Sequence, residues 1–479
     1  MEDELIERLQ QNSLLLEQVK QIPVLQEIIT QLSEQVKRLQ EQIAKDRHNS
    51  SLSPSSDRFS RQRKSNSLRT RSGKKAGGQP GHHGQTLEMS AIPDEIVTVP
   101  TVIQSQHSHS DLSEVTAKTV ERRQVIDIPA PPPLQVTQYE GHWKQCPQCQ
   151  GYTPAVFPAG VSAPVQYGPR IGAMAVYLTT QQLLPRGRTA EVLRDVAGVH
   201  MSEGTVTTLI TRTAHLLKPI EHQIKTALGQ AKVIHQDETG LYVMGKRIWL
   251  HVTCTRPLTH YFAHVSRGHD ALDEIGILAH FAGTSVHDSW KAYFLYGCQH
   301  SLCCVHILRE LTSLSQEMGL WWAYRMILLL IRMKTMTDHA RILGQATLLP
   351  EDIQALHAQF LALLDQGDQV HPRAPATPGK RGQAKQHPAR NLLDRLRTHQ
   401  DAVLAFLYDL DVPFDNNLAE RDVRMVKVQQ KVSGTFRSHE GAISFCRIRG
   451  YLSSLRKQGA PLFAALEATL RGQPLLPSN

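Results

Sequence analysis

Three acidic residues that lie far apart along the chain occupy contexts suited to metal-ion chemistry. Asp237 follows a short apolar run and precedes a Thr-Gly dipeptide, which predicts a strand that ends in a tight turn at this carboxylate. Asp288 follows the segment 284–287 in a similar arrangement, and Glu420 begins an amphipathic segment. We expect Asp237, Asp288 and Glu420 to meet in the folded chain.

Such a group of carboxylates has a defined chemistry. Mg²⁺ and Mn²⁺ prefer oxygen ligands, and two such ions about 4 Å apart can stabilise the attacking and leaving oxygens of a displacement at phosphorus. Each residue also has a structural interpretation. Asp237 would be an exposed turn residue, Asp288 a helix cap, and Glu420 part of a capping box with Asn417 as N-cap.

The segment that follows Glu420 carries a row of basic residues. Glu420, Arg424, Lys427 and Lys431 fall at helical spacing on one face, and Arg421 lies beside them. A solvated helix face more usually mixes charge signs. The spacing therefore predicts that these four basic side chains bind a DNA backbone next to the metal site.

Length and composition limit the class of protein. A chain of 479 residues is too long for one core, and a net charge of +9 indicates a polyanionic partner, most commonly nucleic acid. No apolar run is long enough to cross a bilayer, and the polar N-terminus predicts no secretory signal. Seven scattered cysteines fit a reducing cytoplasm.

The first 90 residues predict two different segments. In residues 1–45, aliphatic side chains from Ile22 to Ile43 recur in steps of three and four, which favours a coiled coil that joins copies of the chain over a single amphipathic helix. Residues 46–90 form either a solvated linker or a disordered arm that binds phosphate. The candidate DNA-binding residues of this arm are Arg58, Arg61, Arg63, Lys64, Arg69, Arg71, Lys74 and Lys75.

Residues 91–165 predict a small module that resembles a zinc finger. Cys146 and Cys149 form a Cys-x-x-Cys pair, which is half of a tetrahedral zinc site, and His107 and His109 are candidates to complete it. The alternative is a pair of unliganded thiols. Three alternating runs predict short strands, at 95–99, 123–127 and 134–139.

Residues 166–230 predict a helix-turn-helix. Gly198 supplies the turn, and Ser202 can cap a second helix that extends to Ala214. Arg212 on this second helix would enter a major groove. An ordinary helical hairpin that packs on the next domain is the alternative.

The rest of the chain predicts an α/β core with an insertion. Residues 231–310 hold the first part of the core, residues 311–400 a helical insertion with a basic loop, and residues 401–479 the last helices of the core. The predicted order is strand, strand, strand, helix, strand, which is that of a ribonuclease-H-like core. These elements are 233–237, 247–253, 259–265, 274–281 and 284–287.

A further group of candidate ligands follows Asp288. His300, Cys303, Cys304 and His306 either form a second zinc site or pack beneath the first site as buried side chains. The packing interpretation is favoured, because free cysteine is among the most buried residue types.

Long motifs over most of the chain resemble one known family. They are Asn49-Ser-Ser-Leu-Ser-Pro-Ser-Ser-Asp57, Gly77-Gly-Gln-Pro-Gly-His-His-Gly84, Ser202-Glu-Gly-Thr205, His287-Asp-Ser-Trp290, Cys303-Cys-Val-His-Ile-Leu-Arg-Glu310 and Val412-Pro-Phe-Asp-Asn-Asn-Leu-Ala-Glu-Arg-Asp-Val-Arg-Met-Val-Lys-Val-Gln-Gln-Lys-Val-Ser-Gly434. Together with the spacing of the three carboxylates, they resemble the DDE transposases of bacterial insertion-sequence family sixty-six.

The resemblance implies a multidomain α/β transposase with an N-terminal zipper, a zinc-finger-like module, helix-turn-helix elements and a ribonuclease-H-like core. Asp237, Asp288 and Glu420 map onto the family's triad. They would hold two divalent ions, cut double-stranded DNA at the transposon ends and join it to target DNA, beside small accessory proteins. The chain departs from the family at Ser105 and Ser108, where members carry Cys-x-x-Cys, and serine is a poor zinc ligand.

Two other functions share most of these features. A DNA-binding regulator or inhibitor of transposition would keep every DNA-binding element around an inert core. A hydrolytic nuclease would cleave DNA without joining the ends. The carboxylate triad favours the transposase over the first alternative.

Overall fold

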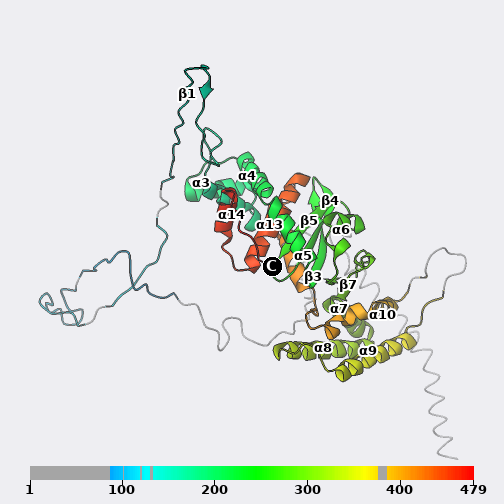
Figure 1. The fold of residues 1–479 in the computed structure, drawn as a ribbon. Helices are drawn as coiled ribbons and strands as arrows, with labels where there is room; N and C mark the ends of the chain where they lie inside the picture. Colours follow the sequence, from blue (N-terminus) through cyan, green and yellow to red (C-terminus); the bar gives the residue numbers. More distant parts are fainter. Residues whose placement is uncertain are drawn as a thin grey trace, which may run out of the picture. The chain divides into compact units, whose positions relative to one another are not determined.

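Figure 1 shows the fold of the chain in a computed structural model, which describes residues 87–100, 102–118, 121–129, 133–375, 384 and 386–478. The predicted coiled coil over 1–45 and the basic residues between 58 and 75 lie outside the described residues. None of the helices in these ranges is long and apolar enough to cross a membrane.

A five-stranded mixed sheet lies at the centre of the described chain, in the order β5-β4-β3-β6-β7. The first three strands form an antiparallel meander, and β6 and β7 continue the sheet parallel to β3. Their bounds are β3 Val233–Val243, β4 Lys246–Cys254, β5 Thr259–His264, β6 Thr284–His287 and β7 Gln299–Leu302. The fold is therefore mixed α/β, with β3 in the middle of the sheet.

The prediction that the first strand ends at Asp237 is wrong. β3 continues through the Thr-Gly dipeptide, and Gly240 pairs with Trp249 on β4. The turn lies later, at Met244 and Gly245, which both have positive φ, as a two-residue hairpin requires. Gly240 itself has no positive φ, and a Cβ at this position would lie 2.9 Å from the end of the flexible Arg247 side chain, which would have to shift.

Two further elements differ from the sequence prediction. The helix expected at 274–281 is displaced toward the N-terminus as α6 His269–Ile275, because Gly276 adopts the left-handed conformation and ends it. A short 3₁₀ turn at Leu278–His280 follows. The polar strand β7 was not predicted at all.

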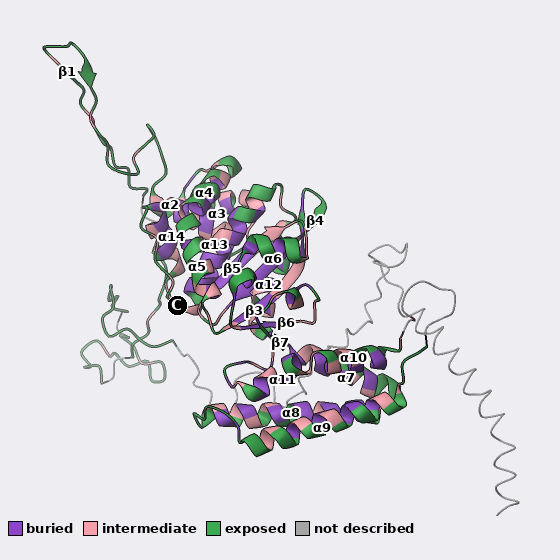
Figure 2. Cartoon of the chain, turned by 45° about the vertical axis from the view of Figure 1, so that its right-hand side comes forward, coloured by how far each residue is buried: buried purple, intermediate pink, exposed green. Residues whose placement is uncertain are grey.

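Helices cover both faces of the sheet, and Figure 2 shows the buried residues between the layers. On one face, α12 Asn417–Ser433 and α13 His439–Lys457 pack on the apolar side chains of β3 and β4. On the other, a second core joins Ile234 of β3 to the helices α2 Pro169–Val176, α4 Glu203–Leu216, α5 Lys218–Gly229, α6 and α14 Leu462–Leu470.

Five helices between β7 and α12 share a separate core that includes Trp322, Met326 and Phe360. They are α7 Cys304–Met318, α8 Trp321–Ile342, α9 Pro350–Val370, α10 Pro388–Thr398 and α11 Gln400–Tyr408. The chain enters and leaves this helical insertion at one place, because the backbone N–H of Cys304 donates a 3.1 Å hydrogen bond to the carbonyl of Phe414.

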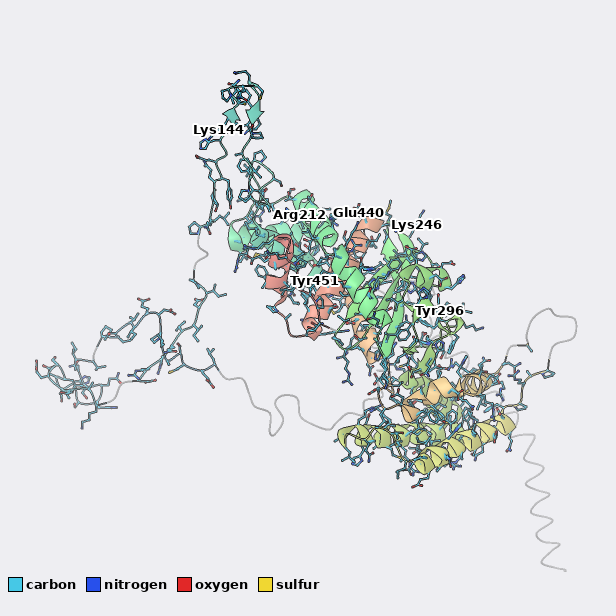
Figure 3. All side chains as sticks on the ribbon, viewed as in Figure 1. Lys144, Arg212, Lys246, Tyr296, Glu440 and Tyr451 are labelled. Atoms are coloured by element: carbon cyan, nitrogen blue, oxygen red, sulfur yellow. The ribbon has the colours of Figure 1, made fainter. Side chains whose placement is uncertain are left out.

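The predicted helix, turn and cap around Gly198 are confirmed. α3 Arg186–Ala197 ends at Gly198 with φ of 64°, and the Ser202 hydroxyl accepts a 3.1 Å hydrogen bond from the Thr205 N–H at the start of α4. Arg212, labelled in Figure 3, is exposed on α4. Its contact with a major groove stays a prediction.

The three strands predicted between residues 91 and 140 are wrong. The described residues between 91 and 165 contain only β1 Lys144–Gln145 and β2 Tyr152–Thr153 as strands, and both lie after the three predicted runs. Ile96, Val125 and Val136 are at least 80% exposed, so no neighbouring layer buries one face of these alternating runs. Alternation alone does not stabilise a strand without a partner and a surface to cover.

Candidate active site

The sheet register brings Asp237 and Asp288 side by side. His235 of β3 pairs with Val286 of β6, and each aspartate lies two residues further along its parallel strand. Neighbouring strands are about 4.8 Å apart, and residues two apart point to the same face. Asp237 shares its face with Leu241, so both carboxylates lie on the side of the sheet that α12 covers.

Hydrogen bonds from the backbone orient the two aspartates. The Oδ1 atom of Asp237 accepts from the Glu238 N–H at 2.8 Å, and the Oδ1 atom of Asp288 accepts from the Trp290 N–H at 2.9 Å. Asp288 therefore fixes a local turn just beyond β6 and does not cap a helix that starts at Ser289.

Glu420 comes from the first turn of α12, with a side chain that is 12% exposed. The interpretation of Asn417 as its N-cap is wrong, because the helix begins at Asn417 and Asn416 precedes it. Asn416 makes no capping bond within the helix. Its side chain donates to the carbonyl of Gln236 at 2.7 Å and lies 3.0 Å from Nδ1 of His235.

Asn416 thus joins the helix that carries Glu420 to the strand that carries Asp237. It is only 2% exposed, and its contacts lie within two residues of Asp237. The sequence prediction missed this residue. A run of two asparagines before an acidic helix start was the only signal, and it was equally consistent with a cap.

The negative charges of the neighbouring carboxylates act on Asp237. Burial, together with the charges of Glu238, Asp288 and Glu420, raises the pKa of Asp237 to about 7, against the backbone hydrogen bond that lowers it. Such a cluster is costly without a counter-charge. A divalent cation bound between the carboxylates would remove this repulsion, so the residues fit a metal site.

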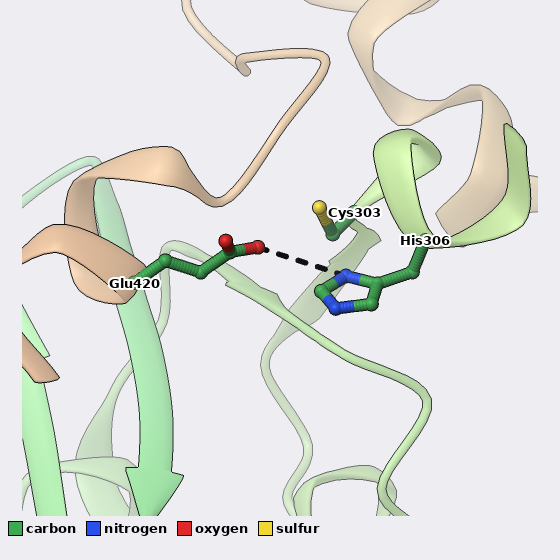
Figure 4. Close-up of side chains that lie close together, drawn as sticks. All are labelled: Cys303, His306 and Glu420. Atoms are coloured by element: carbon green, nitrogen blue, oxygen red, sulfur yellow. Dashed lines mark ion pairs between the residues drawn. The ribbon is translucent and has the colours of Figure 1, made fainter. Parts of the chain in front are cut away.

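The structure does not bring all three carboxylates into one tight group. Among the described residues, one group of at least three candidate ligands has its ligand atoms within 4.8 Å of one another. This group is Cys303, His306 and Glu420. Glu420 faces His306, with 3.8 Å between Oε1 and Nδ1, as Figure 4 shows, and it pairs with Arg424 at 3.3 Å. In this orientation Glu420 is grouped with Cys303 and His306 and not with the two aspartates.

The four predicted ligands that follow Asp288 divide between two environments. Cys304 is fully buried and its thiol donates to the Val403 carbonyl, and His300 lies 3.0 Å from His287, as the packing interpretation predicts. Cys303 and His306 instead lie beside Glu420. Burial raises the pKa of the Cys303 thiol to about 11, against backbone N–H groups that lower it.

Glu238, next to Asp237, points to the opposite face of the sheet and forms a buried clamp. Its carboxylate accepts hydrogen bonds from Arg267 at 2.6 and 2.9 Å and from the Tyr293 hydroxyl at 2.6 Å. The Arg267 guanidinium lies between the rings of Trp249 and Trp290, 4.8 and 3.8 Å from their centroids. Because Trp290 also binds Asp288, this clamp supports the turn that positions Asp288.

The predicted basic face of α12 is only partly available to DNA. Lys427 donates to the carbonyl of Gly240 at 2.7 Å, and burial lowers the pKa of Lys427. Arg424 pairs with Glu420, and Arg421 contacts the helix backbone at Asn417. Lys431 is exposed. Lys427 thus holds α12 on β3, and contact of any of these residues with DNA stays a prediction.

The predicted zinc ligands occupy two separate turns. Cys146 and Cys149 lie in a tight hairpin between β1 and β2, where the N–H groups of Cys149 and Gln148 lower the pKa of Cys146. His107 and His109 lie in a turn closed by the pairing of residues 104 and 111. Within the described residues these four side chains do not form one ligand group, and zinc at this module stays a prediction.

A comparison with protein families identifies the molecule. A model described as Transposase IS66 family matches residues 164–444, a span that includes the sheet, the helical insertion and α12. By class the protein is therefore a transposase, and transposases act on DNA. Because the match covers more than half of the chain, the chain belongs to the IS66 family of transposases, as the motifs predicted.

The N-terminal segment matches a different model. Residues 3–88 match a Family of unknown function (DUF6444), which carries no functional description. No curated protein matches the chain.

The raised pKa of Asp237 predicts the pH dependence of stability. Between about pH 4 and 7, the folded chain holds a proton on Asp237 that the unfolded chain, with a carboxyl pKa near 3.8, has released. Without divalent metal, stability therefore falls as pH rises through this window. Asp237→Asn should raise the free energy of unfolding at pH 8 by on the order of 1–3 kcal/mol, with no gain at pH 4.

Urea unfolding at the two pH values measures this effect. Asp270→Asn, an exposed change on α6, serves as the matched control and should leave stability unchanged at both. A destabilised Asp237→Asn protein at pH 8 would contradict the assignment of a repulsive carboxylate cluster.

The Glu238 clamp generates a second prediction. Arg267→Leu leaves the 2% exposed Glu238 carboxylate without its cation and should cost about 2–4 kcal/mol of stability. The double change with Glu238→Gln should recover part of this loss, because no unpaired charge remains. Chemical denaturation of the four proteins measures the coupling, and additive effects would show that the pair does not act as a unit.

Proposed function

We propose that this chain is the catalytic transposase of its element, with a ribonuclease-H-like core that cuts DNA at the element's ends and joins it to a target. The topology supports the fold assignment: a three-stranded antiparallel meander is extended by two parallel strands, with helices on both faces. The observation that carries the proposal is the register that aligns Asp237 with Asp288 beneath the helix of Glu420.

In this proposal Asp237, Asp288 and Glu420 hold two Mg²⁺ or Mn²⁺ ions. When bound, such ions polarise the phosphate and favour deprotonation of the attacking oxygen, first of water and then of a DNA 3′-hydroxyl. Asp237 and Asp288 are preset by backbone hydrogen bonds. Glu420 completes the set by turning from His306, while the buried Asn416 keeps the start of α12 against β3.

Other groups of the chain would bind and orient the DNA. Lys431 and Arg421 are exposed on α12, and Arg212 is exposed on α4, so each is free to contact phosphate. We further propose that the N-terminal coiled coil joins copies of the chain, that the basic arm adds salt-dependent affinity for double-stranded DNA, and that the protein acts in the bacterial cytoplasm with accessory transposition proteins.

Cleavage and joining of end DNA test the proposal. The purified full chain is incubated with DNA that carries both ends of its element, with Mg²⁺ or Mn²⁺, and cut and joined products are scored separately. Asp237→Asn, Asp288→Asn and Glu420→Gln should each reduce cleavage by at least about 10³-fold, which corresponds to roughly 4 kcal/mol of transition-state stabilisation. Asp270→Asn is again the control.

The alternatives give different outcomes in the same assay. Equal product from the parent and Asp237→Asn would contradict catalysis by this site and favour a DNA-binding regulator. Cleavage that depends on the triad but yields no joined product would favour a hydrolytic nuclease.

A further inference from the structure

The start of α7 and the start of α12 bring a sulfur, a nitrogen and an oxygen ligand together. The Sγ atom of Cys303, a ring nitrogen of His306 and a carboxylate oxygen of Glu420 all lie within 4.8 Å of one another. Figure 4 shows the three side chains pointing toward a common point from two helices. Cys303 and His306 are one helical turn apart, so they lie on the same side of α7.

Two of these ligand atoms are buried without a hydrogen-bond partner. They are Nδ1 of His306 and Oε1 of Glu420, which face each other at 3.8 Å. This distance is too long for a hydrogen bond, which needs about 2.7–3.2 Å. A tetrahedral ion with nitrogen and oxygen bonds of about 2.0–2.2 Å holds those two ligand atoms roughly 3.3–3.5 Å apart. The two atoms therefore need to approach by only a few tenths of an ångström to hold an ion between them.

The surroundings of Cys303 also suit a metal ligand. Cys303 occupies the N-cap position of α7. Burial raises the pKa of its free thiol, and a bound metal ion would displace the thiol proton. Its sulfur accepts a 3.2 Å hydrogen bond from the backbone N–H of Asn416, the residue that holds α12 against β3. Hydrogen bonds of this kind from outside the ligand set orient metal ligands and tune their basicity.

We propose that Cys303, His306 and Glu420 form a binding site for one thiophilic divalent ion of the zinc class, which shares Glu420 with the proposed magnesium site. The mixed sulfur, nitrogen and oxygen donors select such an ion over Mg²⁺, which prefers oxygen ligands. Three protein ligands leave the fourth position of a tetrahedral ion open to water or a phosphate oxygen.

The site has a regulatory consequence, which rests on the proposed function. Glu420 belongs to both proposed ligand sets, and its carboxylate here lies beside Cys303 and His306 and is not grouped with the two aspartates. Binding of Zn²⁺ at Cys303 and His306 would therefore hold Glu420 away from Asp237 and Asp288 and inhibit Mg²⁺-dependent cleavage.

Cobalt titration tests the site independently of activity. The full chain, with Cys146→Ser and Cys149→Ser to silence the other predicted zinc ligands, is stripped of metal and titrated with Co²⁺. One equivalent should produce a thiolate-to-cobalt charge-transfer band that Zn²⁺ removes and millimolar Mg²⁺ does not. Cys303→Ser should abolish the band, and His306→Ala or Glu420→Gln should weaken Co²⁺ binding at least about tenfold.

Cys298→Ser is the matched control, because Cys298 is a buried free thiol outside the ligand group and its loss should leave the band unchanged. The absence of a band, or a band that survives Cys303→Ser, would overturn the site. If Cys303→Ser does not fold, His306→Ala decides, since the His306 side chain is 43% exposed. Unchanged Co²⁺ affinity in that variant would also overturn the site.

The cleavage assay separates this proposal from the function. In the parent protein, one equivalent of Zn²⁺ should reduce the rate of Mg²⁺-dependent DNA cleavage. In Cys303→Ser, the rates with and without Zn²⁺ should be nearly equal. A protein that shows the cobalt band but cleaves no DNA would contradict the proposed function and support the proposed metal site. A protein that cleaves DNA but shows no cobalt band would support the proposed function and contradict the metal site.

Discussion

The buried hydrogen bonds of Asn416 are the interaction on which the site depends. The side chain binds β3 at Gln236 and His235, and the backbone N–H binds the sulfur of Cys303 at the start of α7. Three segments far apart in the sequence thus meet at one residue, through its side-chain amide and its backbone N–H. Because a buried polar group that loses its partners is costly, the start of α12 cannot drift from the sheet without penalty. The positions of Glu420, Cys303 and His306 all follow from this contact.

The two faces of β3 carry buried carboxylates with different partners. Burial is the largest cause of the raised pKa of Asp237, and the charges of Glu238, Asp288 and Glu420 add to it. Its neighbour Glu238, although also buried, has a cation and a hydroxyl as partners. The clamp around Glu238 stabilises the strand from behind, which allows the opposite face to keep a cluster that is unfavourable by itself. This division is typical of sites in which the scaffold compensates for local repulsion.

Sequence patterns correctly predicted the helices and strands whose structure depends mainly on local residues. β4, β5, β6 and the cap at Ser202 follow from alternation and capping chemistry. The failures have tertiary causes. Gly240 resembled a turn but lies inside the long β3–β4 pairing, and the alternating runs after residue 94 lack a layer to cover. The three acidic residues of the candidate site, Asp237, Asp288 and Glu420, could be selected from the sequence. The convergence of Cys303 and His306 on Glu420 could not, because it depends on how distant helices pack.

The helical insertion begins and ends at a single hydrogen bond, between Cys304 and Phe414. Arg341 of α8 reinforces this point by donating to the carbonyls of Leu410 and Val412. The insertion also packs on the sheet, because Leu302 of β7 belongs to its core and Val233 of β3 packs against that core. The position of these helices therefore acts on the sheet through packing as well as through the attachment points. A tilt of the whole insertion would pull on Cys303 and on Asn416 together.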